Sequence, residues 1–379
     1  MKKVLIVAGE ASGDAHGGRL VTAALAKDPT VHFYGVGGNN MREAGVDIQI
    51  DAAELAVVGL WEVIAHRKVI FAALNNLKEQ LKSSPPDLLL LIDYAEFNLK
   101  LAEFAKSIGI KVLFYISPQV WAWRQGRVNK IRDCVDTMAV IFHFEKEFYL
   151  KHNVPAKYVG HPLSHNVKAT MTKTEFLEKH NIDASHNIIG LFPGSRKSEI
   201  KRLLPIILKS ADLLKSENPN RDFLLPLAST LTKQDIEPYL ANTDLNILVI
   251  ENDTFNVMNA CDVIVTVSGT VTLEIALIGT PLIIINKVSW LTYLIVKRMI
   301  KIPYIGLCNI VANKLIADEL IQSQASPLNI AKHIEELFQN KEIYKKKKEA
   351  LGLIHQLLID APADISISDL TLEMLEDKI

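Results

Sequence analysis

Residues 3–14 of the chain read Lys-Val-Leu-Ile-Val-Ala-Gly-Glu-Ala-Ser-Gly-Asp. An uninterrupted apolar run such as residues 4–8 is typical of a strand that is buried on both faces of a parallel sheet. The glycines that follow, Gly9 and Gly13, allow a tight turn and let a ligand approach backbone N–H groups. The segment therefore predicts a strand, a loop and the start of a helix. The spacing is not G-x-G-x-x-G, so for this loop taken alone an ordinary strand-to-helix turn is the stronger interpretation.

The alternation of apolar strands and amphipathic helices continues along the chain and restarts once. We expect further strands in the first half at residues 31–36, 88–92, 111–116 and 137–141, and in the second half at 188–192, 223–227, 247–250, 263–267 and 282–285. The polar stretch 165–187 lacks clear periodicity and marks a domain boundary. The sequence thus predicts an α/β protein with two Rossmann-like domains, residues 1–165 and 166–359, whose ligands bind beyond the carboxyl ends of the strands.

Composition argues against several classes of protein. The chain has 379 residues and a net charge of −1, which gives no general sign of nucleic-acid binding. Its three cysteines, Cys134, Cys261 and Cys308, are far apart, which fits a reducing cytosol better than a disulfide framework or a zinc site. The N-terminal apolar run is too short for a signal peptide, and no apolar run approaches the roughly 18 residues of a transmembrane helix. No Asp-x-Asp or Walker A motif occurs, so we expect neither a metal nor a cofactor.

A loop in the second half, residues 193–199, reads Pro-Gly-Ser-Arg-Lys-Ser-Glu and directly follows a predicted strand. Gly194, Ser195 and Arg196 would lie at the start of a helix, where small residues and a guanidinium suit a phosphate group. A helix start capped by a serine, with Arg196 paired to a carboxylate, is the alternative.

A second such loop, residues 267–274, reads Val-Ser-Gly-Thr-Val-Thr-Leu-Glu. Ser268, Gly269 and Thr270 would begin a helix whose unpaired N–H groups attract a pyrophosphate. Glu274, one turn into that helix, suits the two hydroxyls of a ribose. Simple capping of the helix by Ser268 remains open.

A carboxylate ends the most apolar strand of the first half. Asp93 follows residues 88–92 and lies where a general base would face a ligand, although a helix cap or an ion pair would also explain it. Glu96 and Asn98 are nearby alternatives.

Basic residues and tryptophans alternate in residues 117–127, Ser-Pro-Gln-Val-Trp-Ala-Trp-Arg-Gln-Gly-Arg. Trp121, Trp123 and Arg124 suit a phosphorylated or an amphipathic substrate. The same pattern can bind RNA, but the balanced net charge makes RNA binding the weaker interpretation.

Two apolar-basic segments, residues 57–77 and 289–300, suit contact with an anionic membrane surface. The second lies in a stretch, 275–317, that contains no Asp or Glu. Core helices with snorkelling lysines are the alternative.

Taken together, these segments resemble the lipid-A-disaccharide synthase family. The resemblance rests on Ala-Gly-Glu-Ala-Ser-Gly-Asp at 8–14, Ile-Asp at 92–93, Phe-Asn at 97–98, the block 117–124, Val-Gly-His at 159–161, Pro-Gly-Ser-Arg at 193–196, Ser-Gly-Thr at 268–270 with Glu274, and Asn309. These matches run in family order over nearly the whole chain. One departure is Ala-Glu at 95–96, where the family commonly has Pro-Asp.

The resemblance implies a GT-B type fold, with two Rossmann-like domains facing across a cleft and residues 360–379 crossing back to the N-terminal domain. It implies transfer of 2,3-diacylglucosamine from UDP to 2,3-diacylglucosamine 1-phosphate (lipid X), with inversion to a β-1,6 linkage. The acceptor would bind residues 1–165 and the UDP-sugar residues 166–359. The enzyme would work without a metal as a peripheral protein on the cytoplasmic face of the inner membrane, and its oligomeric state stays open.

The resemblance also implies roles for single residues. Asp93 would accept the hydroxyl proton, Arg196 would stabilise the leaving diphosphate, and Glu10 would orient a substrate. The expected substrate contacts are Gly9, Ser12, Gly13, Asn98, Trp121, Trp123, Arg124, Gly194, Ser195, Ser268, Gly269, Thr270, Glu274 and Asn309.

Two other functions fit the sequence less well. Another GT-B type enzyme, a UDP-GlcNAc epimerase or a peptidoglycan glycosyltransferase, would share the UDP side but not the Trp-Ala-Trp-Arg block. A non-catalytic RNA- or membrane-binding protein would not need ligand loops in both domains.

Overall fold

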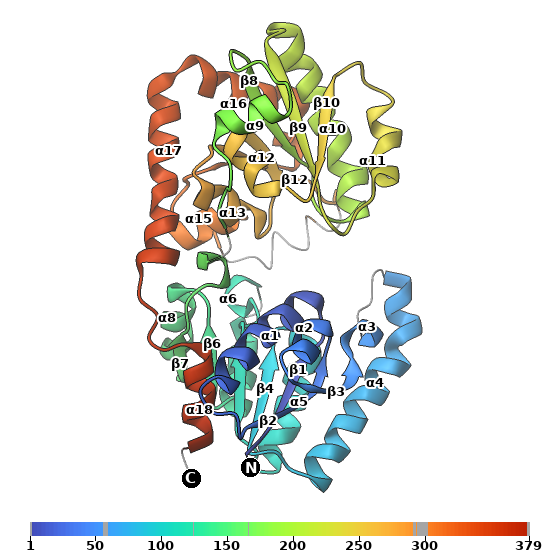
Figure 1. Ribbon diagram of the computed structural model, residues 1–379, viewed down its shortest axis with the longest axis vertical. Helices are drawn as coiled ribbons and strands as arrows, with labels where there is room; N and C mark the ends of the chain where they lie inside the picture. The colour runs from blue at the N-terminus through green and yellow to red at the C-terminus, as the bar shows by residue number, and fades with distance from the viewer. Residues whose placement is uncertain are drawn as a thin grey trace. The chain divides into compact units, whose positions relative to one another are not determined.

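The computed structural model describes residues 2–55, 60–123, 125–165, 167–290, 293 and 302–376 (Figure 1). The chain divides into two compact units. One contains Met1–Pro162 and Pro362–Ile379, and the other contains Leu163–Ala361. The predicted segment 289–300 lies mostly outside the described residues, as does Arg124.

The described part of the first unit contains a seven-stranded parallel sheet in the order β3-β2-β1-β4-β5-β6-β7. Its strands are β1 (Lys3–Ala8), β2 (His32–Gly37), β3 (Asp47–Asp51), β4 (Leu88–Ile92), β5 (Val112–Tyr115), β6 (Thr137–Val140) and β7 (Ala156–Tyr158). Its helices are α1 (Ala11–Leu25), α2 (Asn39–Glu43), α3 (Ala52–Leu55), α4 (Leu60–Ser83), α5 (Ala95–Ser107), α6 (Val120–Trp123), α7 (Val128–Cys134), α8 (His143–Lys151) and α18 (Ile367–Glu376).

The second unit contains a six-stranded parallel sheet among its described residues, in the order β10-β9-β8-β11-β12-β13. Its strands are β8 (Asn187–Phe192), β9 (Arg221–Leu227), β10 (Ile247–Glu251), β11 (Val263–Val267), β12 (Leu282–Asn286) and β13 (Asp318–Ile321). Its helices are α9 (Lys173–Lys179), α10 (Lys197–Glu217), α11 (Lys233–Leu240), α12 (Thr254–Ala260), α13 (Val271–Ile278), α15 (Leu307–Ala312), α16 (Pro327–Gln339) and α17 (Lys341–His355).

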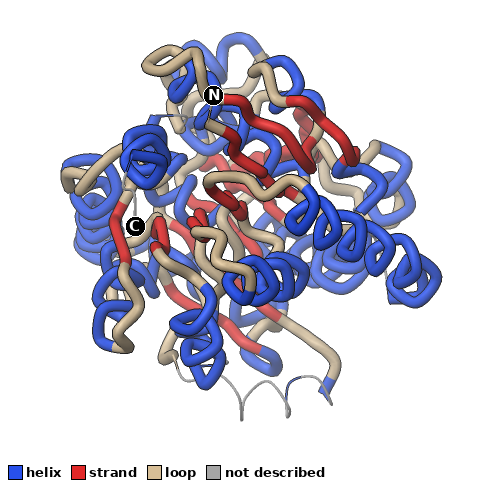
Figure 2. Tube along the Cα trace, turned by 90° about the horizontal axis from the view of Figure 1, so that it is seen from below, coloured by secondary structure: helices blue, strands red, loops and turns tan. Residues whose placement is uncertain are grey.

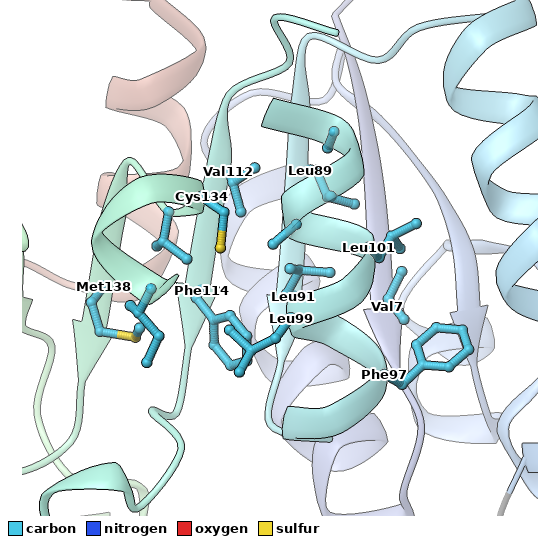
Figure 3. Close-up of a cluster of buried hydrophobic side chains, with 14 of the residues drawn as sticks. Val7, Leu89, Leu91, Phe97, Leu99, Leu101, Val112, Phe114, Cys134 and Met138 are labelled. Atoms are coloured by element: carbon cyan, nitrogen blue, oxygen red, sulfur yellow. The ribbon is translucent and has the colours of Figure 1, made fainter. Parts of the chain in front are cut away.

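Alternate residues of the strands supply two apolar layers, because successive side chains point to opposite faces of a sheet. In the first unit, Leu5 and Val7 pack with α4, α5 and α7, whereas Val4 and Ile6 pack with α1 and α18. Figure 3 shows the first layer between the sheet and α5. Helices, blue in Figure 2, accordingly surround the red strands, as the continuously apolar strands predict.

The C-terminal helix α18 belongs to the first unit and packs on α1 (Figure 1). Lys27, which follows α1, pairs with Asp369 at 2.6 Å. Just before α18, Asp364 accepts a hydrogen bond from the N–H of Tyr158 at 2.8 Å and pairs with Lys146 at 2.7 Å. The return of the chain to its N-terminal domain is therefore confirmed.

Both sheets reverse their strand order at one point, between β1 and β4 and between β8 and β11. In an open α/β sheet, ligands bind outside the carboxyl ends of the strands at such a switch point. In the first unit, the loops with Gly9 and Asp93 follow the two strands at this point. In the second unit, the loops with Gly194 and Ser268 do so. The topology therefore places the predicted ligand loops at two sheet edges.

Candidate functional site

The second unit has a cavity of about 470 Å³ at the carboxyl ends of β8, β9 and β11. Seven of the predicted site residues line it: Gly194, Ser195, Arg196, Ser268, Gly269, Thr270 and Glu274. The two loops that the sequence singled out are thus brought together. The cavity is also lined by Glu199, Ser229 and Thr254, which the sequence reasoning missed. The latter two follow β9 and β10, so the same search after every strand would have found them.

The loop after β8 is folded by Glu199. Its Oε2 atom accepts hydrogen bonds from the N–H groups of Ser195 at 3.0 Å and Arg196 at 3.2 Å. Gly194 has a φ of +111°, and a Cβ there would lie 2.3 Å from Glu199 Oε2, so the turn requires glycine. Because Glu199 accepts hydrogen bonds from these two N–H groups, the loop offers a phosphate mainly the guanidinium of Arg196. This guanidinium lies 3.6 Å from Glu199 Oε1, so Arg196 is paired with a carboxylate, but its side chain is still 79% exposed.

The loop after β11 leaves its backbone N–H groups available. Within the described part of the chain, no acceptor bonds the N–H groups of Gly269, Thr270 or Val271 at the start of α13. Among the described residues, a Cβ at Gly269 would meet nothing within 4 Å, so the approach from their side is open. The Ser268 hydroxyl does not cap the helix but donates to the carbonyl of Ile305 at 2.6 Å. Free N–H groups at the start of a helix attract an anion.

Glu274 lines the same cavity one turn into α13. It is half-buried, and this burial raises the pKa of its carboxyl group. A carboxylate beside an anion-binding helix start can accept hydrogen bonds from neutral hydroxyl groups.

The first unit has a separate cavity of about 370 Å³, lined by Glu10, Asp93 and Glu96, by Lys100, and by apolar side chains of α4 and α5. The apolar part comprises Ile70, Phe71, Leu74 and Phe97. A cavity with carboxylates at one end and apolar side chains beside them suits an amphipathic ligand.

Asp93 is held in an unusual turn. Its φ is +48°, its N–H donates to the carbonyl of Tyr115 at 3.0 Å, and Asn98 donates to the carbonyls of Ile92 at 3.2 Å and Asp93 at 2.7 Å. Burial and the nearby charge of Glu10 both raise the pKa of Asp93. Asn98 is fully buried, and these two hydrogen bonds position the turn at Asp93; its contact with substrate stays a prediction.

Glu96 differs from Asp93 because it has a partner. Arg127 donates to Glu96 Oε1 in an exposed ion pair. A carboxylate engaged with a guanidinium is a weaker base, because the positive charge favours its ionised form.

The Gly9–Asp14 motif serves mainly to pack the first loop. A Cβ at Gly9 would lie 2.4 Å from the Tyr94 ring, and one at Gly13 would lie 3.3 Å from the Cβ of Ala8. Asp14 accepts hydrogen bonds from the N–H groups of Gly38, Asn40 and Met41 at 2.6–3.1 Å, which ties this loop to the one after β2. Ser12 is exposed, whereas Gly9 and Gly13 are buried; the substrate contacts expected for all three stay predictions.

Trp121, a further predicted substrate contact, is also buried. Only 6% of it is exposed, and its indole N–H donates to Glu145 Oε1 at 3.0 Å. The hydroxyl of Ser117 donates to the same oxygen at 2.7 Å. The N–H groups of Ile141 and Phe142 donate to the other oxygen, Glu145 Oε2, both at 3.3 Å. Burial outweighs these four donors and raises the pKa of Glu145 to about 7. The sequence reasoning missed Glu145; the side chain of Trp123 lies outside the described residues.

Asn309, another predicted substrate contact, lies inside the second unit. It is fully buried, and its amide donates to Ala317 O and Glu319 Oε1, both at 2.8 Å. Its oxygen accepts the N–H groups of Ile316 and Ala317 at 2.9 Å. All its polar atoms are therefore used inside the second unit.

In the described part of the chain, no group of three or more His, Cys, Asp or Glu side chains could hold a metal ion. Likewise, no described helix is long and apolar enough to span a bilayer.

Comparison with known proteins adds to this geometry. A family model described as lipid-A-disaccharide synthetase matches residues 4–361. The lipid-A-disaccharide synthase of Geobacter metallireducens is 50% identical over 377 residues, covering 100% of this chain and 98% of the relative, and that of Nitrosococcus oceani is 47% identical over 98% and 96%.

Among solved structures, UDP-GlcNAc 2-epimerase from Neisseria meningitidis bound to UDP-GlcNAc has a TM-score of 0.62 at 16% identity, with 98% of this chain and 99% of that chain covered. MurG of Acinetobacter baumannii has a TM-score of 0.55 at 12% identity, with 99% of each chain covered. These likenesses confirm the predicted GT-B type fold. By its matches in sequence over the full length, the chain belongs to the lipid-A-disaccharide synthase family of glycosyltransferases.

Proposed function

We propose that the second unit binds the UDP-diacylglucosamine donor and the first unit binds lipid X, and that Asp93 activates the acceptor. The cavity at β8, β9 and β11 supports the donor assignment most strongly. It joins an exposed guanidinium, open helix N–H groups and a carboxylate, which match a diphosphate and a ribose.

In the proposed reaction, the 6-hydroxyl oxygen of the acceptor attacks the anomeric carbon of the donor. The bond from that carbon to the diphosphate oxygen breaks, and UDP leaves from the opposite face, which inverts the configuration. Asp93 takes the hydroxyl proton, and Glu10 orients the acceptor beside it. Arg196 and the start of α13 stabilise the charge that grows on the diphosphate, and Glu274 holds the ribose.

The first cavity supports an acylated acceptor. Its carboxylates lie beside apolar side chains of α4 and α5, and Lys100 adds a cation over the ring of Phe71 at 5.1 Å. A sugar that carries both acyl chains and a phosphate has matching apolar and anionic parts.

We further propose that the protein binds reversibly to the cytoplasmic face of the inner membrane. In α4, Val69 is 43% and Phe71 is 44% exposed beside the exposed Lys68. Trp290 is 70% exposed. Exposed apolar side chains near cations favour an anionic lipid surface.

The test of the activity is mass spectrometry of the products from UDP-diacylglucosamine and lipid X. We expect the disaccharide 1-phosphate and UDP, and thermal stabilisation of the protein by UDP alone. Conversion of UDP-GlcNAc without any lipid acceptor would instead support an epimerase, and absence of product together with no UDP binding would refute the proposal.

A further inference from the structure

A second cavity of the second unit lies at the carboxyl ends of β12 and β13 and has a volume of about 550 Å³. Six of the ten described residues that line it are apolar or aromatic, and four are polar. The first group is Val288, Tyr293, Ile302, Pro303, Ile305 and Ile321, and the second is Asn286, Gln322, Ser323 and Gln324. None of the residues assigned to the donor lines it. Its size falls within the range of small-molecule sites.

This apolar cavity shares a wall with the donor cavity. Ser268 lines the donor cavity, and its hydroxyl donates to the carbonyl of Ile305, which lines the apolar cavity, at 2.6 Å. The two spaces are thus separated there by one hydrogen-bonded segment of chain. The proposed function puts the diphosphate at Ser268 and the start of α13, on the donor side of this wall.

Hydrogen bonds to Glu319 hold the segment at Ile305 that forms the shared wall. Glu319 accepts the N–H of Ile305 on both carboxylate oxygens, at 3.1 and 2.9 Å, and the N–H of Gly306 at 2.8 Å. Asn309 donates to the same carboxylate at 2.8 Å. This explains the buried Asn309 as a support of the wall rather than as a ligand contact.

Elsewhere in the lining, the main-chain polar groups of Val288 are also hydrogen-bonded within the protein. The side-chain amide of Gln322 accepts the N–H of Val288 at 2.7 Å and donates to its carbonyl at 3.2 Å. Because these main-chain groups are already bonded, an occupant gains mainly from burial of apolar surface. An alkyl chain fits the apolar side of the cavity, which Val288, Ile302 and Ile305 form.

We propose that this apolar cavity receives one acyl chain of the donor. The assignment rests on the proposed function, in which the donor carries two acyl chains on the sugar attached to its diphosphate. Volume, apolar lining and the wall shared with the diphosphate site all lead to that occupant. The size of the cavity then determines which acyl-chain lengths of the donor the enzyme prefers.

The test uses Val288→Phe, which narrows the cavity, and Val288→Ala, which widens it. Donors with a series of acyl lengths are compared by kcat and KM. In the unaltered protein each added methylene lowers KM by up to about fourfold until the cavity is full. In Val288→Phe, KM should stop falling at shorter acyl chains than in the unaltered protein, and KM for the longest donor should be about tenfold higher. In Val288→Ala, KM should stop falling only at longer acyl chains. UDP affinity should stay within twofold.

Leu328→Phe, on an exposed residue of α16 in the same unit, is the matched control and should keep the unaltered profile. If Val288→Phe does not fold, Ile302→Phe replaces it. An unchanged donor profile with normal UDP binding overturns the inference. So does a shift seen only when the acceptor chain is varied, or a loss of vesicle binding in place of a donor effect. Failure of the unaltered protein to form disaccharide from any donor would refute the proposed function instead.

Discussion

Glu10 and Asp93 line the same cavity of the first unit, and the charge of Glu10 adds to burial in raising the pKa of Asp93. The two residues follow different strands, β1 and β4, which are neighbours in the sheet. A carboxylate with a raised pKa binds a proton more readily, as a general base must. The arrangement leads to a prediction for each residue.

Asp93→Asn should lower kcat by roughly 100–10,000-fold and leave UDP affinity nearly unchanged. Asparagine tolerates the positive φ of this position and keeps its size, but it cannot take the proton. Glu96→Gln is the matched control and should have much less effect, because Glu96 is paired with Arg127. Steady-state kinetics and UDP titration measure both. Reversed effects would make Glu96 the base, and a parallel loss of UDP affinity would contradict the division of roles between the units.

Glu10→Gln should shift the pH dependence of kcat/KM. Asp93 acts as a base when ionised, so the rate rises as pH passes upward through its raised pKa. Removing the negative charge of Glu10 lowers that pKa, and the rising limb should move to lower pH. The position of the limb is compared between the variant and the unaltered protein. A limb that stays in place would show that Glu10 does not act on Asp93.

Arg196→Ala should remove most activity while the protein stays folded. Loss of one charge-assisted contact to the leaving diphosphate costs about 2–4 kcal/mol of transition-state stabilisation. Lys197→Ala is the control in the same loop, since Lys197 pairs with Asp235 at 2.7 Å. Activity assays and circular dichroism check both variants. Activity of Arg196→Ala within threefold of the unaltered protein would be incompatible with the donor site.

Vesicles containing anionic lipid should bind the protein, and added salt should weaken the binding because exposed charges are screened. Val69→Glu should reduce co-sedimentation, as it replaces an exposed apolar side chain of α4 by an anion. Leu150→Glu makes the same change in α8, where Leu150 is 48% exposed, and should bind normally. Equal binding to neutral and anionic vesicles would argue against the electrostatic part of the proposal.

The buried Glu145 should make the first unit less stable as pH rises from about 5 to 7. Its pKa is about 7 in the folded protein against 4.5 ordinarily, so the native state binds more protons than the unfolded chain in this window. Stability therefore falls with rising pH, by up to about 3 kcal/mol. Glu145→Gln should remove this dependence and lower stability by about 1–3 kcal/mol, because an amide cannot accept all four donors. Urea unfolding across this pH range measures the stability of both proteins. If the stability of the variant changes with pH as much as that of the unaltered protein, Glu145 is not the source of the pH dependence.

The positions of the longer strands along the chain were predictable from the sequence, because strands buried on both faces are continuously apolar. The short strands β3, β7 and β13 were not predicted. β3 and β13 are mainly half-buried or exposed, and β7 alternates buried and exposed residues over only three positions. Such short strands form because a neighbouring strand offers unpaired backbone groups, which is a property of the sheet and not of the segment.

The sequence by itself determined the two Rossmann-like series, the family, and the loops at which ligands would bind, because glycines, strand ends and apolar runs act locally. Only the tertiary structure decided which polar side chains of those loops face a cavity. Arg196 is exposed beside one, whereas Asn98, Trp121 and Asn309 turn inward and satisfy buried carbonyl or carboxylate groups. An amide or indole has the same hydrogen-bonding capacity in both settings, and its direction depends on packing between segments far apart in the chain.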